Sequence, residues 1–208
     1  MTSDILTFLI LAIAFLMVMT KRISALTAGF CVQSFVLSLF TAYAGFRSRN
    51  IELYVVAGLI LAVKVVLIPV MLSRIVKRIK ADENLGLTLS PAASIVSALA
   101  LVCLAWIFAA RYLGSQNASL IASFSVTMIG LFLMIFRMKA VGQIVGLLTM
   151  ENGIFLAGAA IAGGMPFFLE IAIAFDIFAV FLILGLFVYR INSVFTHIDT
   201  DKLNELKG

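Results

Sequence analysis

Long apolar runs alternate with short polar stretches along the whole chain. A transmembrane helix needs about 20 mostly apolar residues. The pattern predicts seven such segments, at residues 4–20, 24–45, 52–73, 92–112, 118–136, 140–162 and 167–189. Each should be an α-helix, because backbone polar groups cannot face lipid unpaired. The first segment is short, and six spans result if it lies in the membrane interface instead.

The composition agrees with lipid as the solvent. Of 208 residues, 63% are hydrophobic and only 12% are charged, and the mean hydropathy is +1.19. A soluble domain is usually about 25% charged. We therefore expect an all-α polytopic membrane protein. The net charge of +5 does not indicate a nucleic-acid partner, because the basic residues form short clusters between apolar runs.

These basic clusters predict the orientation of the chain. Three basic residues fall on one predicted side, namely Arg47, Arg49 and Arg111. Eleven fall on the other, namely Lys21, Arg22, Arg74, Lys77, Arg78, Lys80, Arg137, Lys139, Arg190, Lys202 and Lys207. Since cytoplasmic loops carry the excess of Lys and Arg, the N-terminus is expected outside and the C-terminus in the cytoplasm. No positive charge precedes the first apolar run, so we expect a retained span rather than a cleaved signal.

Three ionisable side chains lie near the centres of predicted helices: Lys64, Glu151 and Asp176. At about 1.5 Å per residue, each lies roughly 15 Å from the nearer membrane surface. Placing such a group there costs about 2.5–3.5 kcal/mol or more, and intramembrane charges usually mark transport routes. The set therefore suggests a proton pathway or polar switch. The alternative is a structural Lys–carboxylate pair that holds helices together.

Two acids and one base cannot all be neutralised in pairs. If Lys64 pairs with Glu151 or Asp176, the remaining acid can stay protonated and exchange protons, because burial disfavours the charged form of a carboxyl group. Glu170 lies a few residues inside the outer end of the last segment. It is either a further proton-transfer group or an acid at the membrane interface.

Two packing features accompany these charges. Segment 140–162 and its end carry a stripe of small residues at helical spacing, namely Gly142, Gly146, Thr149, Gly153, Ala157, Ala160 and Gly164. Glu151 points about 200° away from Thr149 around the helix. The side of the helix with the small residues, its smooth side, should therefore meet one helix and Glu151 another.

Pro69 cannot donate to the carbonyl of Val65. This predicts a kink beside Lys64, unless the helix simply tolerates the proline.

Metal and cofactor chemistry finds no support in the sequence. There is a single His, and Cys31 and Cys103 both fall inside apolar segments. Buried cysteines of this kind usually act as small hydrophobic side chains. We expect no cofactor or metal in this chain.

The C-terminal part resembles a known family. Its marks are Thr149-Met150-Glu151-Asn152-Gly153, Met165-Pro166-Phe167, Phe175-Asp176 and the tail Phe195-Thr196-His197-Ile198-Asp199. The chain resembles component E of hydrogenase-4, the membrane subunit of the formate hydrogenlyase and hydrogenase-4 group. Residues 118–208 are also similar to the three-helix K subunit of respiratory complex I and to the C subunit of multisubunit cation/proton antiporters.

The resemblance implies a division into a four-helix region at 1–116, a K-subunit-like region at 117–191 and a cytoplasmic tail at 192–208. It also implies proton-transfer roles for two residues. Glu151 matches the first membrane glutamate of the K subunit, and Asp176 matches the second with a shorter side chain. Lys64 has no counterpart in the three-helix subunit.

The resemblance further implies a place in a prokaryotic cytoplasmic membrane, beside antiporter-like subunits and a hydrogenase-like redox arm. Nickel–iron and iron–sulfur centres would then belong to those partner subunits. A subunit of a cation/proton antiporter and a purely structural scaffold remain alternatives.

Overall fold

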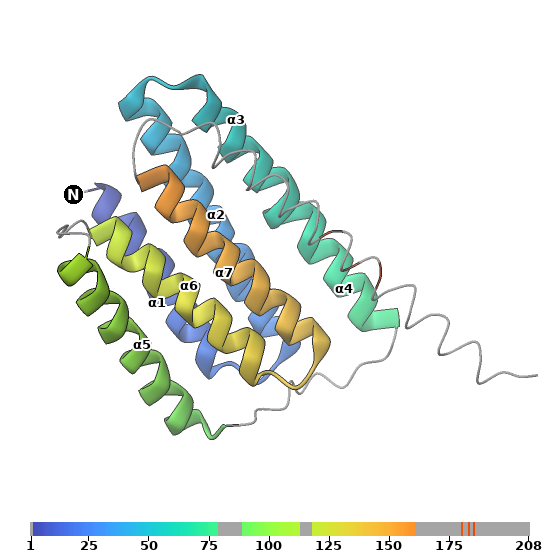
Figure 1. Ribbon diagram of the computed structural model, residues 1–208. Coiled ribbons are helices and arrows are strands. Elements are labelled where there is room, and N and C mark those ends of the chain that lie inside the picture. The colour runs from blue at the N-terminus through green and yellow to red at the C-terminus, as the bar shows by residue number, and fades with distance from the viewer. Residues whose placement is uncertain are drawn as a thin grey trace, which may run out of the picture.

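The computed structural model describes residues 2–78, 89–112 and 118–160, together with positions 180, 183 and 185. Almost all residues in these ranges are helical (Figure 1). The elements are α1 (Thr2–Met19), α2 (Ile23–Ser48), α3 (Ile51–Ile60), the π-helical segment η1 (Leu61–Leu67), α4 (Ile68–Arg78), α5 (Pro91–Tyr112), α6 (Ala118–Phe136) and α7 (Ala140–Ala160). Helices α3, η1 and α4 form one continuous rod.

Six helices in the described part of the chain are long and apolar enough to cross a membrane. They confirm that six of the predicted segments are helices, and their length and composition indicate a membrane protein that is α-helical in the described part of the chain. Helix α1 lies lengthwise beside α2 and α6 (Figure 1), and Ile10 and Ala14 on it are fully buried. The seventh predicted segment, 167–189, lies outside the described residues except at 180, 183 and 185.

The span predicted at 52–73 agrees with the apolar span Ile51–Arg74, although the helix itself extends beyond it. The helix does not stop at residue 73 but continues to Arg78, so Arg74 and Lys77 lie on α4 and not in a loop. Lys and Arg are good helix formers, and neither Gly nor Pro interrupts this stretch. Hydropathy falls before the helix ends, so the apolar pattern marks the end of the span and not the end of the helix.

Four helices, α1, α2, α6 and α7, form the centre of the described bundle. Helix α6 packs against α7, α1 and α5, whereas α2 packs against α1, α7 and the α3–η1–α4 rod. One hydrophobic core joins them, with Phe30, Ile60, Ile129 and Leu148 fully buried. The predicted boundary at 116/117 falls in residues 113–117, outside the described ranges, and the three-part division stays a prediction.

Helices α6 and α7 approach each other closely because glycines line their contact. A side chain at Gly130 would collide with the backbone of Met150, and one at Gly146 with the backbone of Met134. Gly153 likewise faces Thr127. The predicted smooth side of α7 is therefore confirmed, and it lies on α6.

Candidate functional site: a buried charge pair at mid-helix

Lys64 lies near the middle of the rod, on η1, and its side chain is fully buried. The π-helical segment ends just before Pro69, the residue that lacks an N–H. The backbone N–H of Ile68 bonds to the carbonyl of Val63, five residues back. The carbonyl of Val65, which Pro69 cannot serve, accepts a hydrogen bond from Cys31 Sγ at 3.5 Å. Where the sequence predicted a kink beside Lys64, the structure has a π-helical turn within one continuous rod, a feature frequent at functional sites.

Glu151 forms an ion pair with Lys64. The Lys64 Nζ lies 3.1 Å from Glu151 Oε1, and the two side chains are 0% and 3% exposed. Glu151 occupies the middle of α7, on the side away from the glycines that contact α6. The prediction that Glu151 points towards a second helix is confirmed, and the structure shows which acid Lys64 meets among the described residues.

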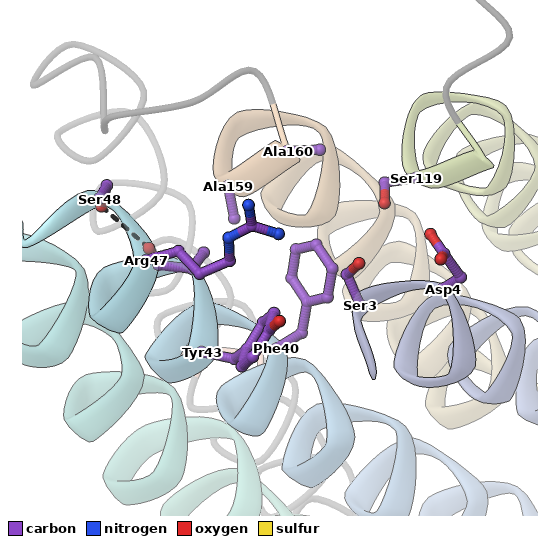
Figure 2. A pocket seen from close by; sticks show the side chains of 10 residues that line it. Ser3, Asp4, Phe40, Tyr43, Arg47, Ser48, Ser119, Ala159 and Ala160 are labelled. Atoms are coloured by element: carbon purple, nitrogen blue, oxygen red, sulfur yellow. Dashed lines mark hydrogen bonds between the residues drawn. The ribbon is translucent and has the colours of Figure 1, made fainter. Parts of the chain in front are cut away.

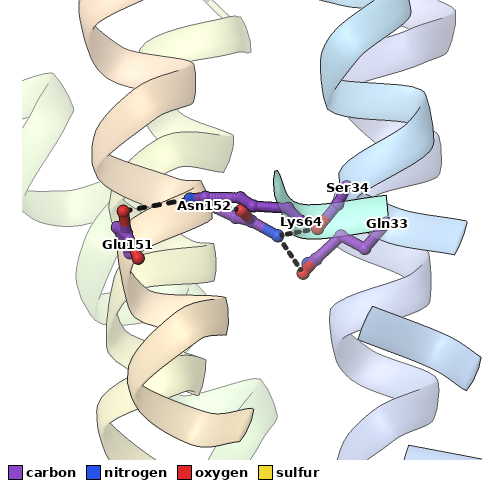
Figure 3. Close-up of polar contacts among 5 residues, drawn as sticks. All are labelled: Gln33, Ser34, Lys64, Glu151 and Asn152. Carbon is purple, nitrogen blue, oxygen red and sulfur yellow. Dashed lines mark hydrogen bonds and ion pairs between the residues drawn. The ribbon is translucent and has the colours of Figure 1, made fainter. Parts of the chain in front are cut away.

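Asn152 extends the pair towards α2 and α1 (Figure 3). Lys64 Nζ donates to Asn152 Oδ1 at 3.1 Å. Asn152 Nδ2 then donates to Gln33 Oε1 at 3.1 Å and to Ser34 Oγ at 3.0 Å. Gln33 Nε2 donates in turn to the carbonyl of Ile10 at 3.3 Å. A buried polar network therefore connects the rod, α7, α2 and α1 at one depth.

An aromatic ring completes the surroundings of the ammonium group. Lys64 Nζ lies 4.2 Å from the ring centroid of Phe155, one turn along α7 from Glu151. A cation over a ring face is attracted by the ring quadrupole, worth about 2 kcal/mol when desolvated. The ring also keeps this face of the ammonium dry, so the positive charge is held mainly by protein groups.

The hydrogen bonds around the ion pair help to offset the cost of burying it. Bringing two ions out of water costs several kcal/mol each, and their attraction offsets this only with good geometry and added hydrogen bonds. The amide of Asn152 supplies such bonds and fixes the direction in which Lys64 extends. A proton added to Glu151 would neutralise the carboxylate and leave Lys64 held by Asn152 and Phe155 alone among the contacts described above.

The sequence located only part of this site. Lys64 and Glu151 come together, whereas Asp176 and Glu170 lie outside the described residues. Sequence reasoning missed Gln33, Ser34 and Asn152 as members of the network. A signal was present, because a Gln and an Asn inside otherwise apolar transmembrane segments usually bond across helices.

Arg137 has a role that the charge pattern did not suggest. It was counted among the solvated cytoplasmic charges, but it is only 2% exposed. Its guanidinium donates to the carbonyl of Thr20 at 2.6 Å, and to those of Met17 and Val18 at 2.9 and 3.2 Å. The last carbonyls of a helix have no partner within the helix. Arg137, in the turn after α6, therefore caps the C-terminus of α1.

A cleft lined by both polar and apolar side chains opens at the other end of the bundle (Figure 2). It has a volume of about 380 Å³, and its lining includes Ser3 and Asp4 of α1, Tyr43 and Arg47 of α2, and Ser119 of α6. One turn below Asp4, Thr7 and Ser119 share a buried hydrogen bond of 3.1 Å. One further turn along α1 comes Ile10, whose carbonyl binds Gln33. Polar groups thus recur along α1 between this cleft and the charge pair.

Comparisons with known proteins add a relative but no function. The chain is 26% identical over 197 residues to the uncharacterized protein Rv0085 of Mycobacterium tuberculosis (strain ATCC 25618 / H37Rv), covering 92% of this chain and 90% of that protein. No protein-family model matches the chain, and no solved structure matches it. The similarity extends along nearly the whole length of both proteins, so the shared part includes most of the described helices.

Proposed function

We propose that this chain is a non-catalytic membrane subunit of a membrane-bound hydrogenase complex of the hydrogenase-4 or formate hydrogenlyase type. In this role its buried charges form part of a proton-translocation path that is driven by redox chemistry in partner subunits. The observation that supports the proposal is the Lys64–Glu151 ion pair at mid-helix, extended through Asn152. The resemblance of the C-terminal segments to the K subunit of complex I supports a role in a redox-driven, proton-translocating complex.

Within this proposal Glu151 receives and releases the proton. Protonation of Glu151 weakens its hold on Lys64, and deprotonation restores it. Asn152 carries no proton but orients Lys64, because its side chain is fixed from the other side by Gln33 and Ser34. Asp176, the match to the second membrane glutamate, is the next group in the path, and Glu170 connects it with the outer surface.

The proposal also specifies the surroundings of the chain. The chain spans a prokaryotic cytoplasmic membrane seven times, with its N-terminus outside and its C-terminus in the cytoplasm. Antiporter-like subunits bind on one side and the anchor of a hydrogenase-like arm on the other. Nickel–iron and iron–sulfur centres reside in that arm.

Proton pumping by the intact complex tests the proposal. In membrane vesicles that hold the complex, Glu151→Gln, Asp176→Asn and Lys64→Met are expected to abolish the redox-driven pH gradient while hydrogenase activity with a soluble acceptor persists. Glu52→Gln is the matched control, because Glu52 is an exposed acid at the start of α3. Wild-type pumping in both the Glu151→Gln and Asp176→Asn complexes would contradict the proposal.

Two other functions fit the same charge pair. A cation/proton antiporter subunit would use Glu151 without redox chemistry, and a scaffold would use the pair only as a link between α7 and the rod. Purification from native membranes separates the three. Nickel- and iron-containing partners support the hydrogenase complex, antiporter subunits alone support the second function, and a stable isolated monomer supports the scaffold.

A further inference from the structure

A groove runs between the first two turns of α2 and the whole of α4. Its volume is about 370 Å³, within the roughly 300–1,000 Å³ typical of ligand sites. Its lining is mostly apolar, with a few polar groups. The residues that define its shape are Ser24, Thr27 and Cys31 on α2 and Pro69, Leu72 and Lys77 on α4.

The groove has a polar rim and an apolar floor. Helix α4 ends at Arg78 where α2 begins at Ile23, so Lys77 and Ser24 lie at the rim. Pro69 is eight residues before Lys77, which places the floor about 12 Å deeper at 1.5 Å per residue. Any ligand that fills the groove must therefore have one polar end and an apolar part that extends towards the bundle centre.

The rim holds one basic residue, and three more lie close to it along the chain. Lys77 lines the groove, and the exposed Arg74 lies one turn before it on α4. Lys21 and Arg22, also exposed, come directly before α2. Neither residues 20–31 nor residues 69–78 include an Asp or Glu. An anionic group at the rim is thus favoured over a zwitterionic or cationic one.

We infer that this groove binds an anionic phospholipid. The phosphate group lies at Lys77, and an acyl chain runs between α2 and α4 to the floor at Cys31 and Pro69. Basic sites between transmembrane helices bind anionic lipid head groups in this way, with about 1 kcal/mol for each Lys or Arg near the surface.

The floor of the groove lies beside the charge pair. Cys31, which lines it, donates to the carbonyl of Val65, the residue after Lys64. A bound acyl chain excludes water from this side of η1. The lipid therefore keeps water from reaching the Lys64 region through the groove, and this effect does not depend on the function of the Lys64–Glu151 pair.

Native mass spectrometry of the full chain in detergent tests the inference. Phosphatidylglycerol and phosphatidylcholine with identical acyl chains are titrated separately, and phosphatidylglycerol is expected to bind more tightly. Lys77→Gln should weaken phosphatidylglycerol binding about fivefold, and Ala28→Phe, which fills the groove, should weaken binding of both lipids. Lys139→Gln, a basic residue of the same end that does not line the groove, is the control and should bind as the wild type does.

Two results would overturn the inference. The first is equal binding of the two lipids, or equal effects of Lys77→Gln and Lys139→Gln. The second concerns water, and uses the Cys103→Ser variant so that Cys31 is the remaining thiol. Phosphatidylglycerol should slow the reaction of Cys31 with a water-soluble thiol reagent, and an unchanged rate would mark the groove as an aqueous inlet. If Ala28→Phe fails to fold, the Lys77→Gln titration and the thiol reaction still decide whether the groove binds an anionic phospholipid.

Discussion

At the level of single residues, the Lys64–Glu151 pair is the feature of the described fold whose disruption should cost the most free energy of folding. Both side chains are almost completely buried and lie 3.1 Å apart. Such a pair adds little net stability compared with apolar residues, but removing one partner leaves an uncompensated buried charge, which costs about 3–5 kcal/mol. Each of the two side chains therefore depends on the other to remain buried as a charged group.

Single and double substitutions should differ in a characteristic way. We expect Lys64→Met and Glu151→Gln each to lower the free energy of unfolding by about 3 kcal/mol. The double variant should recover roughly 2 kcal/mol of the summed loss, because neither charge is then left alone. Denaturant unfolding of the protein in detergent measures all three. Additive losses would show that the two groups do not depend on each other.

Arg137 is a second buried charge with a different partner. It binds three carbonyl oxygens at the end of α1 and not a carboxylate. Cations at a helix C-terminus also interact favourably with the helix dipole. Burial lowers the pKa of Arg137 to about 10 from its usual 12.5. The guanidinium therefore stays protonated at neutral pH and remains a donor.

We expect Arg137→Gln to destabilise the protein by about 2–3 kcal/mol, because charged hydrogen bonds are lost. The difference from wild type should be constant from about pH 6 to 9, since Arg137 is protonated in both the folded and unfolded states there. Above its folded pKa the unfolded state would hold more protons, so this group would then favour folding as pH rises. Thermal unfolding across this pH range checks the result. A difference that changes steadily between pH 6 and 9 would contradict it.

At the level of helices, glycine spacing determines how α6 and α7 meet. Gly130, Gly146 and Gly153 leave no room for a methyl group, whereas a methyl group at Gly58 on α3 would have no neighbour within 4 Å. Small residues allow backbones to approach and pack when lipid provides no hydrophobic drive between helices. This contact holds α7 in place while its opposite side presents Glu151.

Alanine substitutions should separate packing from helix propensity. Gly146→Ala and Gly130→Ala are expected to lower stability by about 1–3 kcal/mol through overpacking. Gly58→Ala is the matched control and should be neutral or stabilising by up to about 1 kcal/mol, because alanine favours helix. Unfolding measurements of the three variants under one condition provide the test. A loss at Gly58 equal to that at Gly146 would show that backbone clash is not the cause.

The sequence predicted the helices better than their contacts. The six apolar runs are six helices in the structure, and counting residues placed Lys64 and Glu151 at similar levels, where the structure shows them in contact. The sequence did not predict that Gln33 joins the network, because the face of α2 that meets α7 is determined by helix packing. Pro69 indicated an irregularity but not its π-helical form, which depends on how the freed Val65 carbonyl finds Cys31.

At the level of the whole molecule, charge divides the two ends of the bundle. The end where α1, α4 and α6 finish carries most of the basic residues, whereas the opposite end holds the cleft with Asp4 and Arg47. Cytoplasmic ends of membrane proteins carry the excess of Lys and Arg. The first of these ends is therefore expected to face the cytoplasm.

Reporter fusions test this orientation. Alkaline phosphatase fused after Arg49 should be active, because this enzyme folds only outside the cytoplasm. The same reporter fused after residue 80 or after Gly208 should be inactive, and green fluorescent protein at Gly208 should fluoresce. The reverse pattern would overturn the orientation, and a phosphatase that is inactive after residue 80 but active after Gly208 would overturn the predicted even number of spans between them.

The Arg137 cap also has a consequence for the order of membrane insertion. The carbonyls of α1 that it binds are synthesised more than a hundred residues before Arg137 itself. While the intervening helices leave the ribosome, the Met17 carbonyl can already accept from Thr20, but the carbonyls of Val18 and Thr20 lack the guanidinium that later binds them. Its final docking therefore waits for the turn after α6. Among the described helices, α1 is made before α6, yet its C-terminal cap is complete only after α6 has been made.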